Sequence, residues 1–371
     1  MTQGVEKIGV FVEAQINMKP LNFTNFLENG ALLRSEPDNW FLLEGPFEKR
    51  PYRTPGDIAL FHPDFFSDSE LSYWIPKAFY RLTTRQMESL VGPASDSPLA
   101  SMHWQEGEFQ SFKESFSAIL EQIHQGHLQK AVPVVFEKSS EIPGPKERLS
   151  MLRSLLKAPG NLYVFGSWDG DQGILGATPE VLLRQCGTQV STMALAGTCP
   201  KTEATQRRSL LADPKERLEH DLVVQDILQS LGRFGTLTTQ GPEILELPTL
   251  FHLKTEIACQ LAEAGSFSFF EACQGLHPTP ALGLSPRRFG YQWLQGLPEQ
   301  KDRGGFGAPW GMQWAEQEAL CLVAIRNIQW NESGARIGSG CGLVAQSDLQ
   351  QEWRELFQKR QSVKKILGLE S

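Results

Sequence analysis

The sequence has 371 residues, with 43 acidic against 35 basic side chains and a formal net charge of −8. This balance disfavours a nucleic-acid-binding protein, which normally presents a basic surface to phosphates, but it leaves room for a small anionic ligand held by a few buried cations. The 22 Phe and 9 Trp residues exclude a disordered chain, because that much apolar surface offsets the entropy of ordering.

Segments for membrane insertion, export or disulfide bonding are not evident. No run of 18 apolar residues occurs, and the first 20 residues lack the apolar core of a signal peptide. We therefore expect a cytoplasmic protein with no membrane or nucleic-acid partner, and a monomer, since no apolar interface helix is evident. The cysteines are spread singly without a CxxC pair, which disfavours a zinc site or a disulfide framework. They are Cys186, Cys199, Cys259, Cys273, Cys321 and Cys341.

The first third of the chain predicts short elements followed by a helix and a strand. Residues 1–100 contain short apolar segments broken by Pro, Gly and Asp, and GPASDSP at 92–98 reads as a loop. Apolar residues then recur on one helical face from about 107 to 126, where Gly126 is a plausible stop. KAVPVVFEK at 130–138 is rich in Val and predicts a strand.

The middle of the chain predicts an antiparallel meander and then a well-capped helix. Residues 161–198 alternate short β-favourable runs with DG, QG and CG turns. The helix over 213–231 begins with Asp213 as N-cap, Pro214 at the first helical position and Glu216 at the capping-box position.

The last third predicts a strand pair and a terminal helix. LCLVAIRNIQW (320–330) and ARIGSGCGLVA (335–345) read as strands joined by NESG, and Ser347 is a candidate N-cap with Gln350 three residues later. Strands precede and follow helices without βαβ alternation. The expected fold class is therefore α+β with large antiparallel sheets.

Two acidic pairs stand on the two best-defined helices. Glu216 and Glu219 are three residues apart, as are Glu352 and Glu355, so each pair shares one helical face. A single such pair is most often a solvated acidic face. Two pairs brought together would form an oxygen-rich site suited to Mg²⁺, which takes one or two carboxylates directly and fills its other positions with water or substrate oxygens.

A string of motifs in order resembles the chorismate-utilising enzymes, which include the isochorismate, salicylate, anthranilate and aminodeoxychorismate synthases. The motifs are GATPEVLL (176–183), ALAGT (194–198), DPKERLEHDLVVQDI (213–227), LHPTPALG (276–283), VAIR (323–326), GSGCGLV (338–344) and EWRELFQK (352–359). The resemblance implies large antiparallel sheets packed as a sandwich flanked by helices, as in anthranilate synthase component I. It also implies one domain over 1–371, with a variable N-terminal part at 1–104 and the chorismate-binding catalytic region at 105–367.

The resemblance also assigns a catalytic pair. GHLQKAV (126–132) aligns Lys130 with the lysine that activates water, and ATPE aligns Glu180 with the acid that protonates the leaving hydroxyl. Lys130 must then be uncharged to accept a proton, while Glu180 must be protonated, so its pKa should be raised. Without the family, a lysine at a strand end and a glutamate after Pro179 would be read as ordinary solvated residues.

The remaining matches concern metal and substrate. Glu219 and Glu355 match direct Mg²⁺ ligands, and Glu216 and Glu352 match residues that bind the metal through water. Substrate-binding residues follow from the same motifs. Those matching groups that hold the substrate carboxylates are Arg326, Lys359, Gly340 and Gly342, and those matching residues that line the site or pack near the ring are His252, Gly197 and Ala281.

Within the family, Lys130 and the HPTPA segment favour the isochorismate synthases. The expected activity is Mg²⁺-dependent isomerisation of chorismate to isochorismate, for menaquinone or siderophore biosynthesis. The alternatives are a salicylate synthase or another chorismate-converting enzyme, and a chorismate-binding protein with weak catalysis. The last alternative is motivated by FGAPWG (306–311), where Ala308 replaces an expected Gly and the bulky Trp310 is expected near the site.

Overall fold

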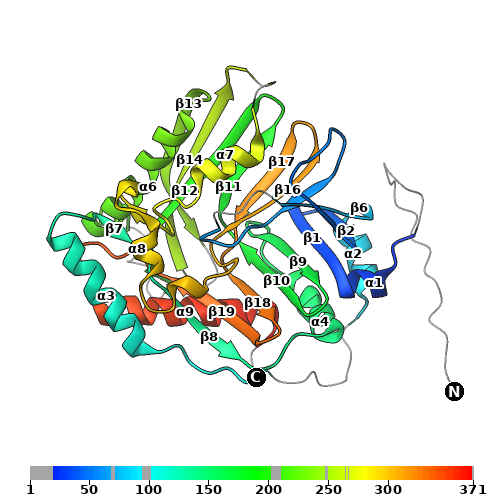
Figure 1. Cartoon of the computed structure of the whole chain (residues 1–371), viewed down its shortest axis with the longest axis horizontal. Coiled ribbons are helices and arrows are strands. Elements are labelled where there is room, and N and C mark those ends of the chain that lie inside the picture. The colour runs from blue at the N-terminus through cyan, green and yellow to red at the C-terminus, as the bar shows by residue number, and fades with distance from the viewer. Residues whose placement is uncertain are drawn as a thin grey trace.

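Two large antiparallel sheets dominate the molecule (Figure 1). The computed structural model describes residues 20–67, 72–93, 102–201, 210–246, 250–263, 265 and 267–369. Part of the loop expected at 92–98 lies outside these residues. No helix among the described residues has both the length and the apolar character needed to cross a membrane.

The eight-stranded sheet combines strands from both ends of the chain. Its order is β6 (Ala78–Leu82), β2 (Asn39–Glu44), β1 (Asn29–Glu36), β9 (Tyr163–Asp169), β10 (Gln172–Thr178), β18 (Asn327–Asn331), β19 (Gly334–Gly340) and β8 (Val134–Ser139). The β1 strand pairs with β9 in the middle of this sheet. The early residues, which carry no motif, therefore form part of the same layer as the late ones.

The nine-stranded sheet has the same mixed origin. Its order is β13 (Gly235–Glu246), β14 (Leu250–Leu261), β12 (Gln189–Pro200), β11 (Val181–Cys186), β17 (Glu318–Val323), β16 (Pro309–Ala315), β4 (Ala59–Phe61), β5 (Tyr73–Ile75) and β3 (Glu48–Arg50). A separate two-stranded sheet joins β15 (Leu284–Ser285) to β7 (Lys130–Ala131). The antiparallel strands expected at 161–198 form, but the single meander is wrong: β9 and β10 pair in the eight-stranded sheet, whereas β11 and β12 pair in the nine-stranded sheet.

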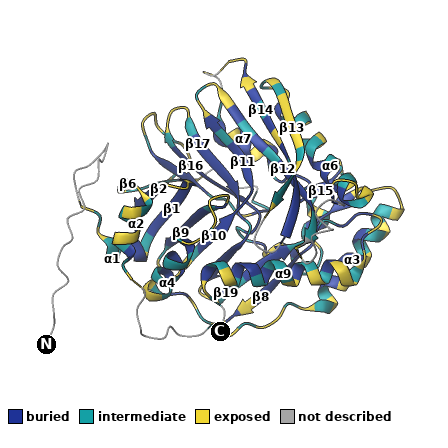
Figure 2. Cartoon of the chain, turned by 180° about the vertical axis from the view of Figure 1, so that it is seen from behind, coloured by how far each residue is buried: buried dark blue, intermediate teal, exposed yellow. Residues whose placement is uncertain are grey.

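The sheets face each other and helices cover their outer faces. Side chains of both sheets, among them Leu33, Phe165 and Leu322, pack into one cluster between them. The helices on the outer face of the eight-stranded sheet are α1 (Phe23–Glu28), α2 (Thr84–Val91), α4 (Pro145–Leu155) and α9 (Leu349–Leu367). Those on the nine-stranded sheet are α6 (Pro214–Leu231) and α7 (Phe269–Leu276). Figure 2 shows that buried residues are concentrated on the strands. The α+β sandwich flanked by helices is confirmed.

Helices α3 (Phe109–His124) and α8 (Tyr291–Gln295) cover the two-stranded sheet, and short 3-10 turns at 287–289 and 300–302 lie before and after α8. Helix α6 begins where the sequence predicted, and Asp213 accepts hydrogen bonds from the backbone N–H groups of Lys215 and Glu216. The capping-box role expected of Glu216 is wrong, because its carboxylate accepts from the N–H of Thr198 instead. Similarly, Asp348 rather than Ser347 caps α9.

Two strands predicted as continuous are each divided. The segment 130–138 forms β7 and β8, which belong to different sheets and are separated by Val132 and Pro133. The segment 320–330 forms β17 in the nine-stranded sheet and β18 in the eight-stranded sheet. Arg326, which the sequence placed inside a strand, lies at this crossing with a φ of 56°. Because left-handed backbone ends β-pairing, the chain changes sheets here.

Candidate active site

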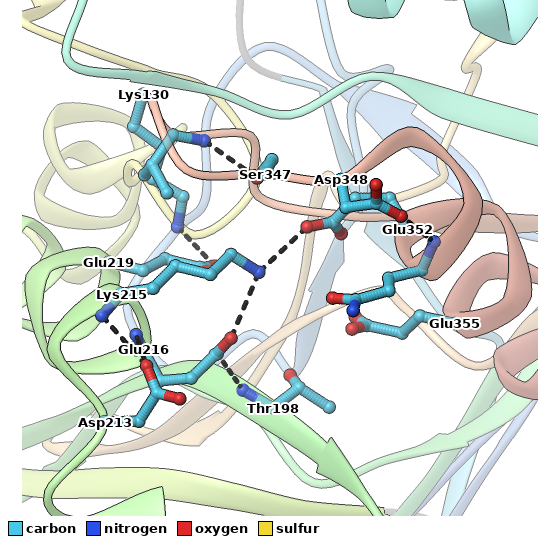
Figure 3. A network of polar contacts seen from close by, with 12 residues as sticks. Lys130, Thr198, Asp213, Lys215, Glu216, Glu219, Ser347, Asp348, Glu352 and Glu355 are labelled. Carbon is cyan, nitrogen blue, oxygen red and sulfur yellow. Dashed lines mark hydrogen bonds and ion pairs between the residues drawn. The ribbon is translucent and has the colours of Figure 1, made fainter.

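The N-terminal ends of α6 and α9 bring the two acidic pairs together, with lysines between them (Figure 3). Lys215 Nζ lies 3.1 Å from Oε1 of Glu216 and 2.9 Å from Oε1 of Glu352. Lys359 Nζ lies 2.6 Å from Oε1 of Glu355. The carboxylates therefore converge as the spacing suggested, but each of these three has a lysine as its partner.

The carboxylates at the N-terminal ends of α6 and α9 are the candidate ligands for a metal ion. Within the described ranges, no three His, Cys, Asp or Glu side chains are gathered as they would be around a metal. The carboxylates nevertheless offer hard oxygen ligands from two helices, and the Lys215 ammonium already bridges a carboxylate of each. A cation is thus held between α6 and α9. These carboxylates fit Mg²⁺ if they release the lysine ammonium groups that they contact in this structure.

Crowding of the carboxylates changes their proton affinities. Burial, and then the charge of neighbouring carboxylates, raises the pKa of Glu216 and of Glu352 to about 7. Burial would also raise the pKa of Glu219, but Lys130, Lys215 and Lys359 together outweigh it and the net direction is down. Glu219, one of the two groups that the family motifs match to direct Mg²⁺ ligands, is therefore held ionised.

Lys130 is completely buried behind Glu219, with Nζ 2.9 Å from Oε1 of that residue. The contact is an ion pair rather than a well-aligned hydrogen bond. Its strand β7 is fixed by pairing with β15 and by backbone hydrogen bonds between Ala131 and Leu343. A Cβ at Gly342 would lie 2.1 Å from Glu219 Oε1 and 2.7 Å from Lys130 Cε, so only glycine leaves room for this pair.

A small cavity of about 60 Å³ lies beside these groups, between β12, β14, β19 and α9. The predicted site residues that line it are Glu180, Glu219, His252, Ala281, Arg326, Gly340 and Lys359. Lining residues that the sequence did not single out include Thr198, Leu282, Phe306, Ile325 and Ser339. The structure thus gathers most of the predicted substrate-binding set with the proposed acid in one place.

Glu180 follows β10 and is buried, with 5% of its surface exposed. Burial raises the pKa of its carboxyl to about 8, although Lys130, Lys359 and Arg326 act in the opposite direction. Desolvation disfavours the charged form more strongly than these cations favour it. At neutral pH the side chain is therefore protonated, which is the state that a proton donor needs.

Arg326 is a buried cation with few protein partners. It is 9% exposed, and its Nη1 donates to Ser362 Oγ at 3.1 Å and to the Lys359 carbonyl at 3.4 Å, both neutral groups. Burial lowers its pKa to about 10, with Glu355 and Glu180 acting in the opposite direction. A strained φ and an unneutralised guanidinium are costly, and such costs are typical of a ligand site. The buried guanidinium is therefore suited to binding an anionic ligand.

His252 presents a second unsatisfied group to the same cavity. Its Nδ1 lies 2.9 Å from Thr198 Oγ1, while its Nε2 is buried without a partner. A bulge at Gly197, with a φ of 80°, shifts the β12–β14 register and brings Thr198 opposite His252. Burial holds the pKa of His252 well below its ordinary value, so the ring is neutral. Nε2 is placed to hydrogen-bond a ligand.

Several predicted residues lie near the cavity without lining it. Behind Glu219 lie Lys130 and Gly342, and around Lys215 lie Glu216 and Glu352. Gly197 supports the cavity wall through its bulge.

The position expected for Trp310 is wrong. Its Nε1 donates to Ser167 between the two sheets, because β16 turns this side chain away from α6 and α7. Trp310 lines a separate, larger cavity of about 630 Å³.

Two of the polar residues that the sequence analysis did not single out, Lys215 and Thr198, hold the site together. Lys215 lies beside Glu216 in the first helical turn, and the adjacent opposite charges were the available signal. Thr198 donates its backbone N–H to Glu216 and places its hydroxyl against His252. The only sequence signal for Thr198 was its position directly after Gly197 in the ALAGT motif.

The chain is similar in sequence to known proteins. The family model described as chorismate binding enzyme matches residues 73–368. The vibriobactin-specific isochorismate synthase of Vibrio cholerae is 30% identical over 77% of this chain and 71% of its own length. The salicylate biosynthesis isochorismate synthase of Pseudomonas aeruginosa is 31% identical over 70% of this chain, but only 55% of its own length is covered.

A solved structure has the same fold. The crystal structure of DhbC from Bacillus anthracis superposes with a TM-score of 0.79 over 93% of this chain and 97% of that chain, at 23% identity. Combined with the family match over residues 73–368, these similarities assign the family. The chain belongs to the chorismate binding enzymes.

Proposed function

We propose that this chain is a Mg²⁺-dependent isochorismate synthase, which converts chorismate to isochorismate. The observation that carries the proposal is the buried carboxyl of Glu180, protonated at neutral pH, in one cavity with the cations Arg326 and Lys359. Relatives named as isochorismate synthases, at 30% and 31% identity, support the same activity.

The cavity provides complementary groups for a dianionic ring. Arg326 and Lys359 can hold one substrate carboxylate through charge-assisted hydrogen bonds. The unpartnered Nε2 of His252 can hydrogen-bond a ring substituent or carboxylate oxygen. Bound Mg²⁺, held by Glu219 and Glu355 directly and by Glu216 and Glu352 through water, would supply positive charge for the other carboxylate.

The catalytic pair then moves two protons. Lys130, whose ammonium pairs with Glu219 in this structure, must first lose a proton. The neutral amine then takes a proton from a water molecule whose oxygen forms a bond to one ring carbon. Glu180 gives its proton to the hydroxyl that leaves another ring carbon as water, and the ring double bonds shift between the two carbons. One water enters and one leaves, so the reaction is an isomerisation that needs no oxidant or reductant.

The test is direct product analysis. Purified protein is incubated with chorismate and MgCl₂, and the products are separated chromatographically, with an EDTA-treated sample as control. Isochorismate formed only with MgCl₂ is the expected result. Salicylate with pyruvate would replace this proposal with the salicylate synthase alternative, and calorimetric binding of chorismate without any product would identify a non-catalytic binder. Genomic neighbours would distinguish menaquinone from siderophore biosynthesis as the destination of the product.

A further inference from the structure

Lys215 is the one of the three lysines around the acidic pairs whose ammonium touches both helices. Its Nζ lies 3.1 Å from Glu216 on α6 and 2.9 Å from Glu352 on α9, whereas Lys130 pairs with Glu219 and Lys359 with Glu355. The Lys215 side chain is 22% exposed and that of Glu352 only 3% exposed. The ion pair is therefore shielded from solvent, and Figure 3 shows Lys215 at the centre of the network.

The charge of Lys215 is firmly held at this position. Burial opposes its charged form, but the carboxylates of Glu352 and Glu216 outweigh burial and raise the pKa of the ammonium. Without this cation, Glu216 and Glu352 would face each other across the two helices, and a buried pair of like charges is destabilising. Lys215 thus supplies between α6 and α9 the neutralisation that a metal ion would supply.

We propose that Lys215 is a positioning residue that acts as an internal cation: it keeps the metal-free site assembled, and Mg²⁺ must displace it in order to load. The proposal rests on the metal requirement of the proposed function. In the proposed arrangement Glu216 and Glu352 hold Mg²⁺ through water, so the water ligands of the metal and the Lys215 ammonium compete for the same carboxylate oxygens, and the two cations repel each other at this short range. Each bound state therefore excludes the other. Mg²⁺ binding must therefore break the Lys215 contacts, and the free energy needed to break them weakens the apparent affinity for Mg²⁺.

The variant Lys215→Met tests this directly, since it removes the charge and keeps most of the aliphatic stem. Mg²⁺ binding is measured by titration calorimetry with MgCl₂ at fixed ionic strength, without chorismate, and melting temperature is measured with and without MgCl₂. We expect the Kd for Mg²⁺ to fall about tenfold, a usual size for such coupling. The metal-free melting temperature should fall, and the rise produced by MgCl₂ should be larger than in the wild type.

A matched control separates this effect from a change in net charge. Lys254 also lies between two glutamates, 3.5 Å from Glu243 and 2.6 Å from Glu256, but it stands on β14 outside the acidic pairs. Lys254→Met makes the same charge change and should leave the Kd for Mg²⁺ within twofold of the wild type. If Lys215→Met does not fold, Lys215→Gln serves in its place.

Several outcomes would overturn the inference. An unchanged or weaker Mg²⁺ affinity in the variant, or equal loss of melting temperature with and without MgCl₂, would make Lys215 a purely structural ion pair. Absence of Mg²⁺ binding in both proteins would overturn it as well. Because these measurements contain no chorismate, they are independent of turnover. A wild-type protein that binds Mg²⁺ but makes no isochorismate would overturn the proposed function and leave the role of Lys215 intact.

Discussion

Among the cavities lined by the described residues, two differ greatly in size, and we place the chemistry in the smaller one. The larger, of about 630 Å³, opens between the sheets. Two of its cations, Lys49 and Lys138, are half exposed and paired with Asp169 and Glu299, and a third, Arg336, lies near enough to Asp302 and Asp64 for their charges to act on it. The smaller, of about 60 Å³, holds the buried Arg326 with only neutral hydrogen-bond partners. Volume therefore does not mark the site. Charge that is buried and left unbalanced does, because the protein tolerates its cost only where a ligand offsets it.

The largest expected effect is on turnover at the small cavity. Lys130→Ala should lower kcat by roughly 10²- to 10⁴-fold, the usual contribution of general acid–base catalysis, while chorismate binding by calorimetry stays near the wild-type value. Lys138→Ala, in the wall of the large cavity, is the matched control and should keep kcat within threefold. Retention of most activity by Lys130→Ala would refute the base assignment.

Binding should show the same contrast at a smaller size. Arg326→Met should weaken chorismate binding about 10- to 100-fold, because a charged hydrogen bond contributes about 1.5–3 kcal/mol. Arg336→Met makes the same change in the large cavity, where the guanidinium stacks on Phe136, and should shift the Kd less than threefold. Equal losses in the two variants would remove the distinction between the cavities. Calorimetry with chorismate measures both.

The pH dependence tests the protonated acid. Because the pKa of Glu180 rises from 4.5 to about 8 on folding, kcat/KM should fall as pH rises through about 8. The same shift contributes stability that is complete below pH 4.5 and is lost as pH rises through about 8. Glu180→Gln should be inactive and should lose less stability than the wild type between pH 6 and pH 9 in urea unfolding. An identical pH response of the two proteins would contradict the shift.

The smallest expected effect concerns the tryptophan that the sequence placed near the site. Trp310→Phe removes the hydrogen bond to Ser167 and should lower the free energy of unfolding by about 1 kcal/mol. Turnover of chorismate should stay within twofold, since Trp310 lines the large cavity only. A tenfold loss of kcat without loss of stability would show that Trp310 does contribute to the active site.

Local patterns in the sequence predicted local structure well. Asp213 and Pro214 fixed the start of α6, since capping depends on neighbouring residues alone. The crossing at Arg326 was not predictable, because VAIRNIQW reads as one strand and no local signal tells which of the two sheets each part of it joins. The order of strands in each sheet was missed for the same reason: it depends on pairing between distant segments.

The site could be predicted where chemistry is carried by motifs, and not where it depends on packing. Glu180 and Arg326 were identified through the family motifs, yet their burial, which makes one a proton donor and the other an anion site, depends on the surrounding elements. Lys215 shows the limit clearly. Its sequence neighbour Glu216 was visible, but Glu352 lies 137 residues away, and its approach follows from the meeting of α6 and α9.

The position of β1 limits how far this enzyme can be truncated from its N-terminal side. The family match begins at residue 73, but β1 (Asn29–Glu36) and β4 (Ala59–Phe61), which precede it, pair with β9 and β16 inside the two sheets. A fragment that starts at the family boundary would lose an inner strand and expose β9 as an open edge, which invites aggregation. The segment without motifs is thus not a removable extension, and shortened versions intended for crystallisation or engineering should retain it.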